Sequence, residues 1–441
     1  MRLIDNFGVE KASTSGEYRS VRGPGRYFGG IEPPLCTVFS RDRWGHHGVQ
    51  AVLRKYKYFQ NPKTGPAEPW GHIPVTPRFS GVGRIVLSVD QRDARTTRYD
   101  SIAKTLATVN DRELMDLVAA VPPMGSGIGR ALAALEIDGT KVIVKRIPLT
   151  DRENQPRNRR STANIFTLPL YFQYGVSSVG FGAWRELASQ IETTNWVLAG
   201  DSENFPLMYH WRVLPRPRPP SLTLDEAQQI DHQVTYWGGS PAIRARLSEI
   251  RSASADVLLF LEYIPQNLRV WLGEQVRKGQ ETALAALTMV EHDLREVTSF
   301  MGSRGMLHFD AHFDNLLTDG HRLYFADLGL ALSKSFDLSA EEAAFLERHA
   351  DFDRAYVMTR LVNHLVDASS GFESRNAVVR EHVHGTKDSR LPQSQASLVK
   401  RYASTAMLMN DFYARLRTES KTTVYPAEQI GKACRAAGLL P

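Results

Sequence analysis

The chain has 441 residues, of which 42% are hydrophobic and 23% charged. The length predicts two or three domains, and the composition is that of an ordinary soluble globular protein. The net charge of +6 comes from residues 1 to 100, which have 16 Lys and Arg against 9 Asp and Glu. Such a region could attract an acidic peptide, a nucleotide or nucleic acid, but we favour a solvated basic surface and expect no nucleic-acid partner.

Three further absences bear on location. No apolar stretch is long enough to span a membrane, and the first residues are charged where a secretion signal needs an apolar run. The two cysteines, Cys36 and Cys434, lack metal-ligand spacing and suggest no disulfide framework. We therefore expect a cytoplasmic protein with no membrane partner.

Residues 1 to 95 are rich in Gly, Pro and aromatic side chains, which predicts an accessory region of turns and short strands. The expected strands cover 51 to 59 and 83 to 89. Histidines in this region could bind a metal, but in a turn-rich segment we interpret them as surface residues; they are His46, His47 and His72.

A helical pattern follows from residue 92 to 121, with Asn110 or Asp111 as its internal N-cap. Beyond it, three glycines precede a hairpin that Asp138 and Gly139 should close, and the returning strand contains Lys145. Glycines let backbone N–H groups approach a phosphate chain, and a lysine on the paired strand would point its charge at the same phosphates. The glycines are Gly125, Gly127 and Gly129.

The next elements alternate between strand and helix. We expect a polar surface loop at 151 to 164 and a helix starting near Ala183, whose Glu186 and Glu192 are either solvated or available to pair with Lys145. A strand, a proline-rich linker, and a buried strand followed by a helix come next. They cover 206 to 214, 215 to 221 and 256 to 272. Later helical patterns cover 281 to 303, 339 to 366 and 392 to 417.

The stretch from Leu307 to Gly329 concentrates polar chemistry around a predicted hairpin with an Asp319-Gly320 turn. The hairpin should bring Asp310 and Asn315 close to Asp327, and such oxygen ligands suit Mg²⁺ with substrate phosphates. Two alternatives remain open. One is a solvated surface hairpin, and the other is a metallohydrolase site that uses alternating ligands along an extended strand, namely His308, Asp310, His312 and Asp314.

His308-Phe309-Asp310, Asn315 and Asp327-Leu328-Gly329 resemble the H-x-D-x-x-x-x-N and D-F-G motifs of the protein-kinase superfamily. The glycine-rich stretch and Lys145 resemble that family's phosphate loop and lysine strand. Arg130 stands where the third glycine of G-x-G-x-x-G would be, so the detail of the phosphate covering departs from the pattern.

The resemblance implies an α+β, bilobal kinase-like fold, with a small β-rich lobe, a larger helical lobe and an accessory region. The implied boundaries are 1 to 95, 96 to 264 and 265 to 441. It also implies ATP and Mg²⁺ as cofactors, with Lys145 on the α- and β-phosphates and held there by Glu186, or by its rival Glu192.

The resemblance assigns the remaining roles residue by residue. Asp310 would orient the acceptor hydroxyl, Asn315 and Asp327 would hold the metal, and His308 would support the loop. The hinge between the lobes would bind adenine through backbone groups of Glu262, Tyr263 and Ile264.

The acceptor is open between two classes. The glycine-rich loop and the hinge favour Ser or Thr of a protein or peptide. Phe309 in place of arginine argues against control by a phosphorylated loop, no A-P-E motif follows Asp327, and His312 resembles the H-G-D-x-H pattern of aminoglycoside phosphotransferases and choline kinases. A small-molecule hydroxyl is therefore the alternative, and a nucleotide-binding pseudokinase a further one.

Overall fold

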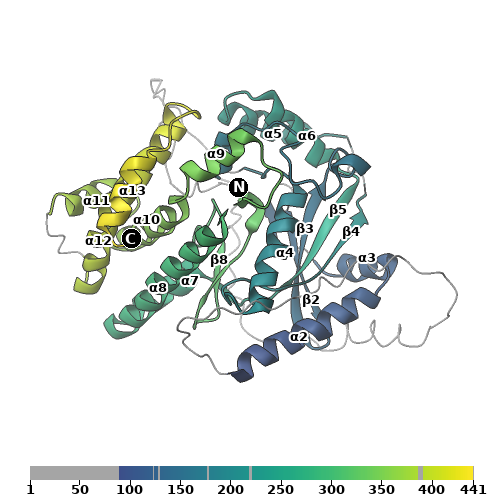
Figure 1. Ribbon diagram of the computed structural model, residues 1–441, viewed down its shortest axis with the longest axis horizontal. Coiled ribbons are helices and arrows are strands. Elements are labelled where there is room, and N and C mark those ends of the chain that lie inside the picture. The colour runs from purple at the N-terminus through teal and green to yellow at the C-terminus, as the bar shows by residue number, and fades with distance from the viewer. Residues whose placement is uncertain are drawn as a thin grey trace, which may run out of the picture. The chain divides into compact units, whose positions relative to one another are not determined.

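The structure is a mixed α and β arrangement in which small antiparallel sheets are covered and joined by helices (Figure 1). This computed structural model describes residues 89–122, 124–127, 130–175, 178–217, 221–385 and 391–440. The predictions for strands before residue 89, for the three N-terminal histidines, for Cys36 and for Gly129 lie outside these ranges.

The largest sheet has five antiparallel strands in the order β1-β2-β3-β5-β4. The predicted hairpin is confirmed: Ile137 pairs with Thr140, and Asp138 and Gly139 between them have φ values of 49° and 74°. Two positive φ values are what a two-residue hairpin turn requires. The strands are β1 (Met124–Gly127), β2 (Arg130–Ile137), β3 (Thr140–Leu149), β4 (Met208–Pro215) and β5 (Ala255–Glu262).

Helices cover both faces of this sheet. Helices α2 (Val89–Thr108) and α3 (Asp111–Ala119) contact β4 and β2 and belong to the same hydrophobic core as Val142 and Val144. The first half of α4 (Ala183–Ala199) belongs to a second core with Ile147 and Leu149. Because side chains alternate along a strand, Lys145 shares the α4 face with the second pair. The predicted cap at Asn110 is confirmed as a capping box with Glu113. The boundary expected after residue 95 falls inside α2.

Two helices between β4 and β5, which sequence reasoning did not identify, follow the proline-rich linker. They are α5 (Leu224–Tyr236) and α6 (Pro241–Ser252). Their N-caps, Thr223 and Ser240, each accept a hydrogen bond from a backbone N–H in the first turn. Trp237, which follows α5, is 1% exposed and packs on Phe172 and Tyr171.

The remainder of the chain is mainly helical, and α10 packs against α8, α11 and α12 (Figure 1). The stretch predicted as helical from 339 to 366 is two helices, separated at residues 349 to 351. The helices are α7 (Leu268–Arg277), α8 (Gln280–Arg304), α9 (Ala340–Arg348), α10 (Phe352–Ser370), α11 (Arg375–Val383), α12 (Gln393–Thr418) and α13 (Ala427–Ala436).

Short strands interrupt these helices, and the predicted second hairpin is present among them. Leu316 pairs with Phe325, and a four-residue turn follows Thr318 in which Asp319 accepts hydrogen bonds from two backbone N–H groups. The short strands are β6 (Gln266–Asn267), β7 (Met306–Leu307), β8 (Leu316–Thr318), β9 (Leu323–Phe325) and β10 (Leu332–Ser333).

The segment from 150 to 182, between β3 and α4, was expected to begin as a solvated loop, and this is wrong for Glu153. Its carboxylate is 1% exposed, accepts hydrogen bonds from the N–H groups of Thr150 and Ala183, and pairs with Arg246 of α6 at 2.6 Å. A buried charge needs such partners, because desolvation otherwise makes its burial unfavourable. The segment also contains the 3-10 helices η1 (Pro156–Asn158) and η2 (Leu170–Tyr174).

None of the helices in the described ranges is long and apolar enough to cross a membrane.

Candidate active site

The side chain of Asp353, in the first turn of α10, binds the backbone of the loop that follows β7. Its two carboxylate oxygens accept hydrogen bonds from the backbone N–H groups of His308, at 2.5 Å, and Phe309, at 3.0 Å. Asp353 is 1% exposed, and this burial raises the pKa of its carboxyl, although the two hydrogen bonds and His308 act against the rise. Asp353 therefore fixes the backbone immediately before Asp310.

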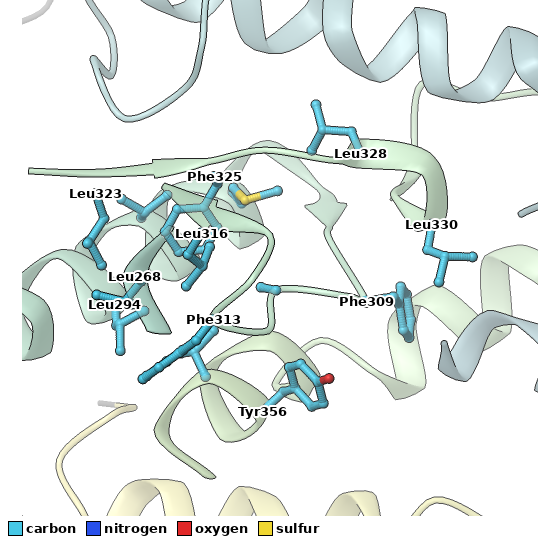
Figure 2. Packing of buried hydrophobic residues seen from close by; sticks show 14 of the residues in the cluster. Leu268, Leu294, Phe309, Phe313, Leu316, Leu323, Phe325, Leu328, Leu330 and Tyr356 are labelled. Atoms are coloured by element: carbon cyan, nitrogen blue, oxygen red, sulfur yellow. The ribbon is translucent and has the colours of Figure 1, made fainter. Parts of the chain in front are cut away.

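Phe309 adopts a positive φ of 62°, which a bulky side chain rarely does. Its ring is fully buried and packs on Phe352 and Phe345, with ring centroids 4.7 and 5.7 Å away. Hydrophobic side chains of the hairpin gather on the other side of the loop, as Figure 2 shows; they are Leu316, Leu323 and Phe325, with Leu268 and Leu294 from the neighbouring helices. Packing on both sides therefore holds a strained backbone in place.

Asp310 and Asn315 are joined across the loop. The Asn315 side-chain amide donates to the Asp310 backbone carbonyl at 2.9 Å and to its carboxylate at 3.1 Å. The Asp310 side chain is 21% exposed. His308 accepts from the Asp310 N–H through Nδ1, so its Nε2 carries the proton and donates to the Ala326 carbonyl at 2.9 Å. As predicted, His308 supports the loop.

Asp327 lies two residues after the hairpin's second strand and faces Lys145 of β3. The distance from Lys145 Nζ to Asp327 Oδ1 is 2.9 Å. Lys145 also forms an ion pair with Glu186 of α4, and both of these side chains are less than a tenth exposed. Glu192 lies elsewhere, because its carboxylate accepts hydrogen bonds from the hydroxyls of Ser333 and Ser335. Of the two rivals, the structure therefore pairs Glu186 with the lysine.

His312 lies beside Asp310, with 3.8 Å between its Nε2 and Asp310 Oδ1. Burial lowers the pKa of this imidazole to about 4, helped by the positive charge of Arg360. His312 is therefore neutral near pH 7 and adds no charge next to the carboxylate.

The metal ligands that a metallohydrolase would need do not line one face of a strand. Residues 308 to 315 form a loop, and both nitrogens of His308 have partners there. In the described ranges, no three His, Cys, Asp or Glu side chains are grouped so as to hold a metal ion. The Asp327 carboxylate and the Asn315 amide oxygen remain a suitable donor set for Mg²⁺, which takes few protein ligands and completes its shell with phosphates and water.

The structure describes two of the three predicted glycines, and they lie on β1, which pairs with β2 and so continues the sheet that contains Lys145. In the predicted hinge, the Glu262 N–H donates to the Leu207 carbonyl at 2.8 Å and is thus occupied. Ile264 follows the end of β5 and lies outside its ladder. Any nucleotide base would therefore use groups beyond the Glu262 N–H.

Sequence reasoning missed three features of this site. Arg95 of α2 forms an ion pair with Glu262 at 2.6 Å and donates to the carbonyls of Glu203 and Phe205. Asp353 lies in the first turn of a helix, where acidic residues are common, so its sequence position gives no sign that it supports a distant loop. The third is Gly175, which lies against Asp310; its residue type, which tolerates a positive φ, was its one signal in the sequence.

Four histidines, of which His349 is buried and the other three are half-buried, give the fold a specific response to acid. Burial lowers the pKa of each to about 4 from an ordinary value of 6.5; they are His210, His312, His349 and His364. Between these two pH values the unfolded chain binds protons that the folded chain does not, so the unfolding free energy falls as the pH drops from 6.5 toward 4. Near pH 5 we expect uptake of about three to four protons by these side chains on unfolding.

Denaturant titrations at several pH values would measure this loss of stability. Buried carboxyls with raised pKa values, such as that of Asp353, act in the opposite direction. The decisive quantity is thus the difference between the wild type and His364→Phe, a change that keeps an aromatic ring on Phe313. For the variant, the slope of the unfolding free energy against pH should correspond to about one proton fewer than for the wild type. Equal slopes for the two proteins would contradict the expectation.

Comparison with known proteins adds no family to this description: no protein-family model matches the chain, and no significant match was found among curated proteins.

Proposed function

We propose that the chain is an ATP- and Mg²⁺-dependent phosphotransferase that moves the γ-phosphate to an acceptor hydroxyl. The observation on which the proposal rests is the junction of Lys145 with both Glu186 and Asp327, beside the linked pair of Asp310 and Asn315. A lysine paired with one carboxylate and facing another, next to a loop with a half-buried carboxylate, is one arrangement that supports phosphoryl transfer. The bilobal kinase-like fold is part of the same proposal.

The contact between Lys145 and Asp327 leaves no space for a phosphate between their polar atoms, which are 2.9 Å apart. Nucleotide binding would therefore separate this pair. Lys145 would turn to the phosphate oxygens while Glu186 keeps it on the α4 side, and Asp327 with Asn315 would hold the metal. Bound Mg²⁺ would neutralise phosphate charge and so lower the barrier to attack.

In the transfer itself, the acceptor oxygen forms a bond to the γ-phosphorus, and the bond from that phosphorus to the β–γ bridging oxygen breaks. The hydroxyl proton passes to Asp310, and ADP leaves with the bond's electron pair. Asp310 can do this because the Asn315 amide and the Asp353-anchored backbone hold its carboxylate in one orientation.

Nucleotide binding tests the proposal directly. The purified chain should bind ATP in the presence of Mg²⁺ in a calorimetric titration, and Lys145→Met should weaken that binding at least tenfold, since it removes the charge aimed at the phosphates. Lys104→Met is the matched control, because Lys104 is an exposed lysine of α2. A chain that binds no nucleotide, or binds it equally well without Lys145, would refute the proposed function.

A second measurement asks where the phosphate goes. Purified protein is incubated with γ-labelled ATP and a cell extract, and the label is separated into protein and low-molecular-mass fractions. A transferase puts more label into an organic product of one fraction than the extract alone does, whereas a pseudokinase adds none. The sequence alone favours the protein fraction, with the small-molecule fraction as the alternative.

A further inference from the structure

The segment between β3 and α4 lies directly against the candidate catalytic carboxylate. Gly175, which follows η2, has a φ of 79°, and a Cβ placed on it would be 3.2 Å from Asp310 Oδ1. A Cβ on Gly180 would be only 2.4 Å from the Gly329 carbonyl. The segment therefore passes within van der Waals contact of both motifs that define the site.

This segment is anchored beside the site. The Tyr174 ring is 5% exposed and packs on Phe412 and Phe345, and its hydroxyl is 2.8 Å from His349 Nε2. The Tyr413 hydroxyl donates to the Tyr174 carbonyl at 3.3 Å. Neighbouring Gln173, 2% exposed, donates to the Leu330 carbonyl.

The chain that follows Asp327 is tied to the same segment from the other side. The hydroxyl of Thr162 accepts from the Asp337 N–H at 2.8 Å. Arg185, at the start of α4, donates to the Thr162 carbonyl and forms a buried ion pair with Glu342 at 2.6 Å. The residues at 162 and 185 are thus joined to residues 337 and 342, which follow Asp327 along the chain.

Resting on the proposed function, the geometry points to a small hydroxyl compound as the acceptor, with the segment from Leu170 to Gly175 as a fixed wall of its binding site. An extended peptide needs several residues of groove on either side of the reacting hydroxyl, at roughly 3.3 Å per residue. On the side of Asp310 where Gly175 lies, such a chain would meet the backbone of this segment, which the buried Tyr174 and Gln173 hold in place. The Asp310 and Asp327 side chains are still 21% and 28% exposed, so a small molecule can reach them.

A single added methyl group at Gly175 tests the role of this wall. Gly175→Ala adds a methyl group in the space beside the Asp310 carboxylate, and Gly371→Ala is the matched control, because Gly371 has a nearly equal φ of 76° with nothing within 4 Å of an added Cβ. With γ-labelled ATP and the metabolite fraction of a cell extract, wild type and Gly371→Ala should form a labelled low-molecular-mass organic product. Gly175→Ala should form it at least tenfold more slowly, while its affinity for MgATP is unchanged.

Hydrogen exchange of the backbone N–H groups from 170 to 175 tests the wall without an acceptor. Protection that persists when MgATP is bound supports a fixed wall. Loss of that protection would overturn the inference while leaving the proposed function intact. The same holds if Gly175→Ala transfers label to the protein fraction of a cell extract as fast as the wild type does. Absence of MgATP binding in calorimetry would instead remove the proposed function and the inference together.

Discussion

Replacing Asp310 by Asn is expected to lower the rate of phosphoryl transfer about a thousandfold, because a general base or orienting carboxylate contributes a factor of about a hundred to ten thousand. The amide has nearly the shape of the carboxylate and can still accept the hydrogen bond from Asn315, which is 3.1 Å in the wild type. Nucleotide affinity should therefore change little, since Lys145 and Asp327 are untouched. Single-turnover measurements with γ-labelled ATP separate the two effects.

Asp314→Asn is the matched control in the same loop. Asp314 is 38% exposed and forms an ion pair with Arg269, which is 40% exposed, at 2.8 Å. Exposed pairs of this kind contribute little, so transfer should fall less than tenfold. If Asp310→Asn kept wild-type turnover, the carboxylate would have no part in the reaction, and the assignment built on this loop would be wrong.

Asp353→Ala is expected to have the largest effect on stability, lowering the unfolding free energy by about 3 to 5 kcal/mol. The change leaves the N–H groups of His308 and Phe309 without their acceptor in a fully buried place, and each such group costs about 1 to 3 kcal/mol. The strained φ of 62° at Phe309 is then less well held. Chemical denaturation followed by circular dichroism would measure the loss.

The unfolding free energy of Asp353→Asn should lie between those of the wild type and Asp353→Ala, because the amide oxygen can still accept one of the two hydrogen bonds. Asp351→Ala serves as the control: Asp351 precedes the same helix, but its side chain is 27% exposed and its nearest ion pair, with Arg354, is 3.5 Å long. We expect a change of about 0.5 kcal/mol or less there. Equal destabilisation by the two alanine variants would show that negative charge at the start of the helix, not support of the loop, explains the effect of Asp353.

Transfer should also fall in Asp353→Asn at temperatures where the variant remains folded. A displacement of the Asp310 carboxylate by about 1 Å can cost about a hundredfold in rate. A loss of stability without any loss of rate would indicate that the loop keeps its shape through packing of Phe309 on α9 and α10 alone.

Much of the local structure could be predicted from the sequence, because turns and helix caps depend on only a few neighbouring residues. An Asp-Gly pair between apolar runs predicted both hairpins, and the choice of Asn110 or Asp111 as an N-cap predicted to within one residue where α3 begins. The order of Lys145, Asp310, Asn315 and Asp327 was likewise visible, since their motifs have short fixed spacings.

Tertiary structure alone decided which distant groups meet. Glu186 and Glu192 lie on one helix with equal chemistry, and only the packing of α4 on the sheet brings the first to Lys145. The burial of Glu153 with Arg246, the support that Asp353 gives to the loop and the approach of Gly175 to Asp310 join residues 30 or more positions apart. Such contacts depend on which surfaces pack together, and hydrophobic burial is not directional, so no local pattern in the chain encodes them.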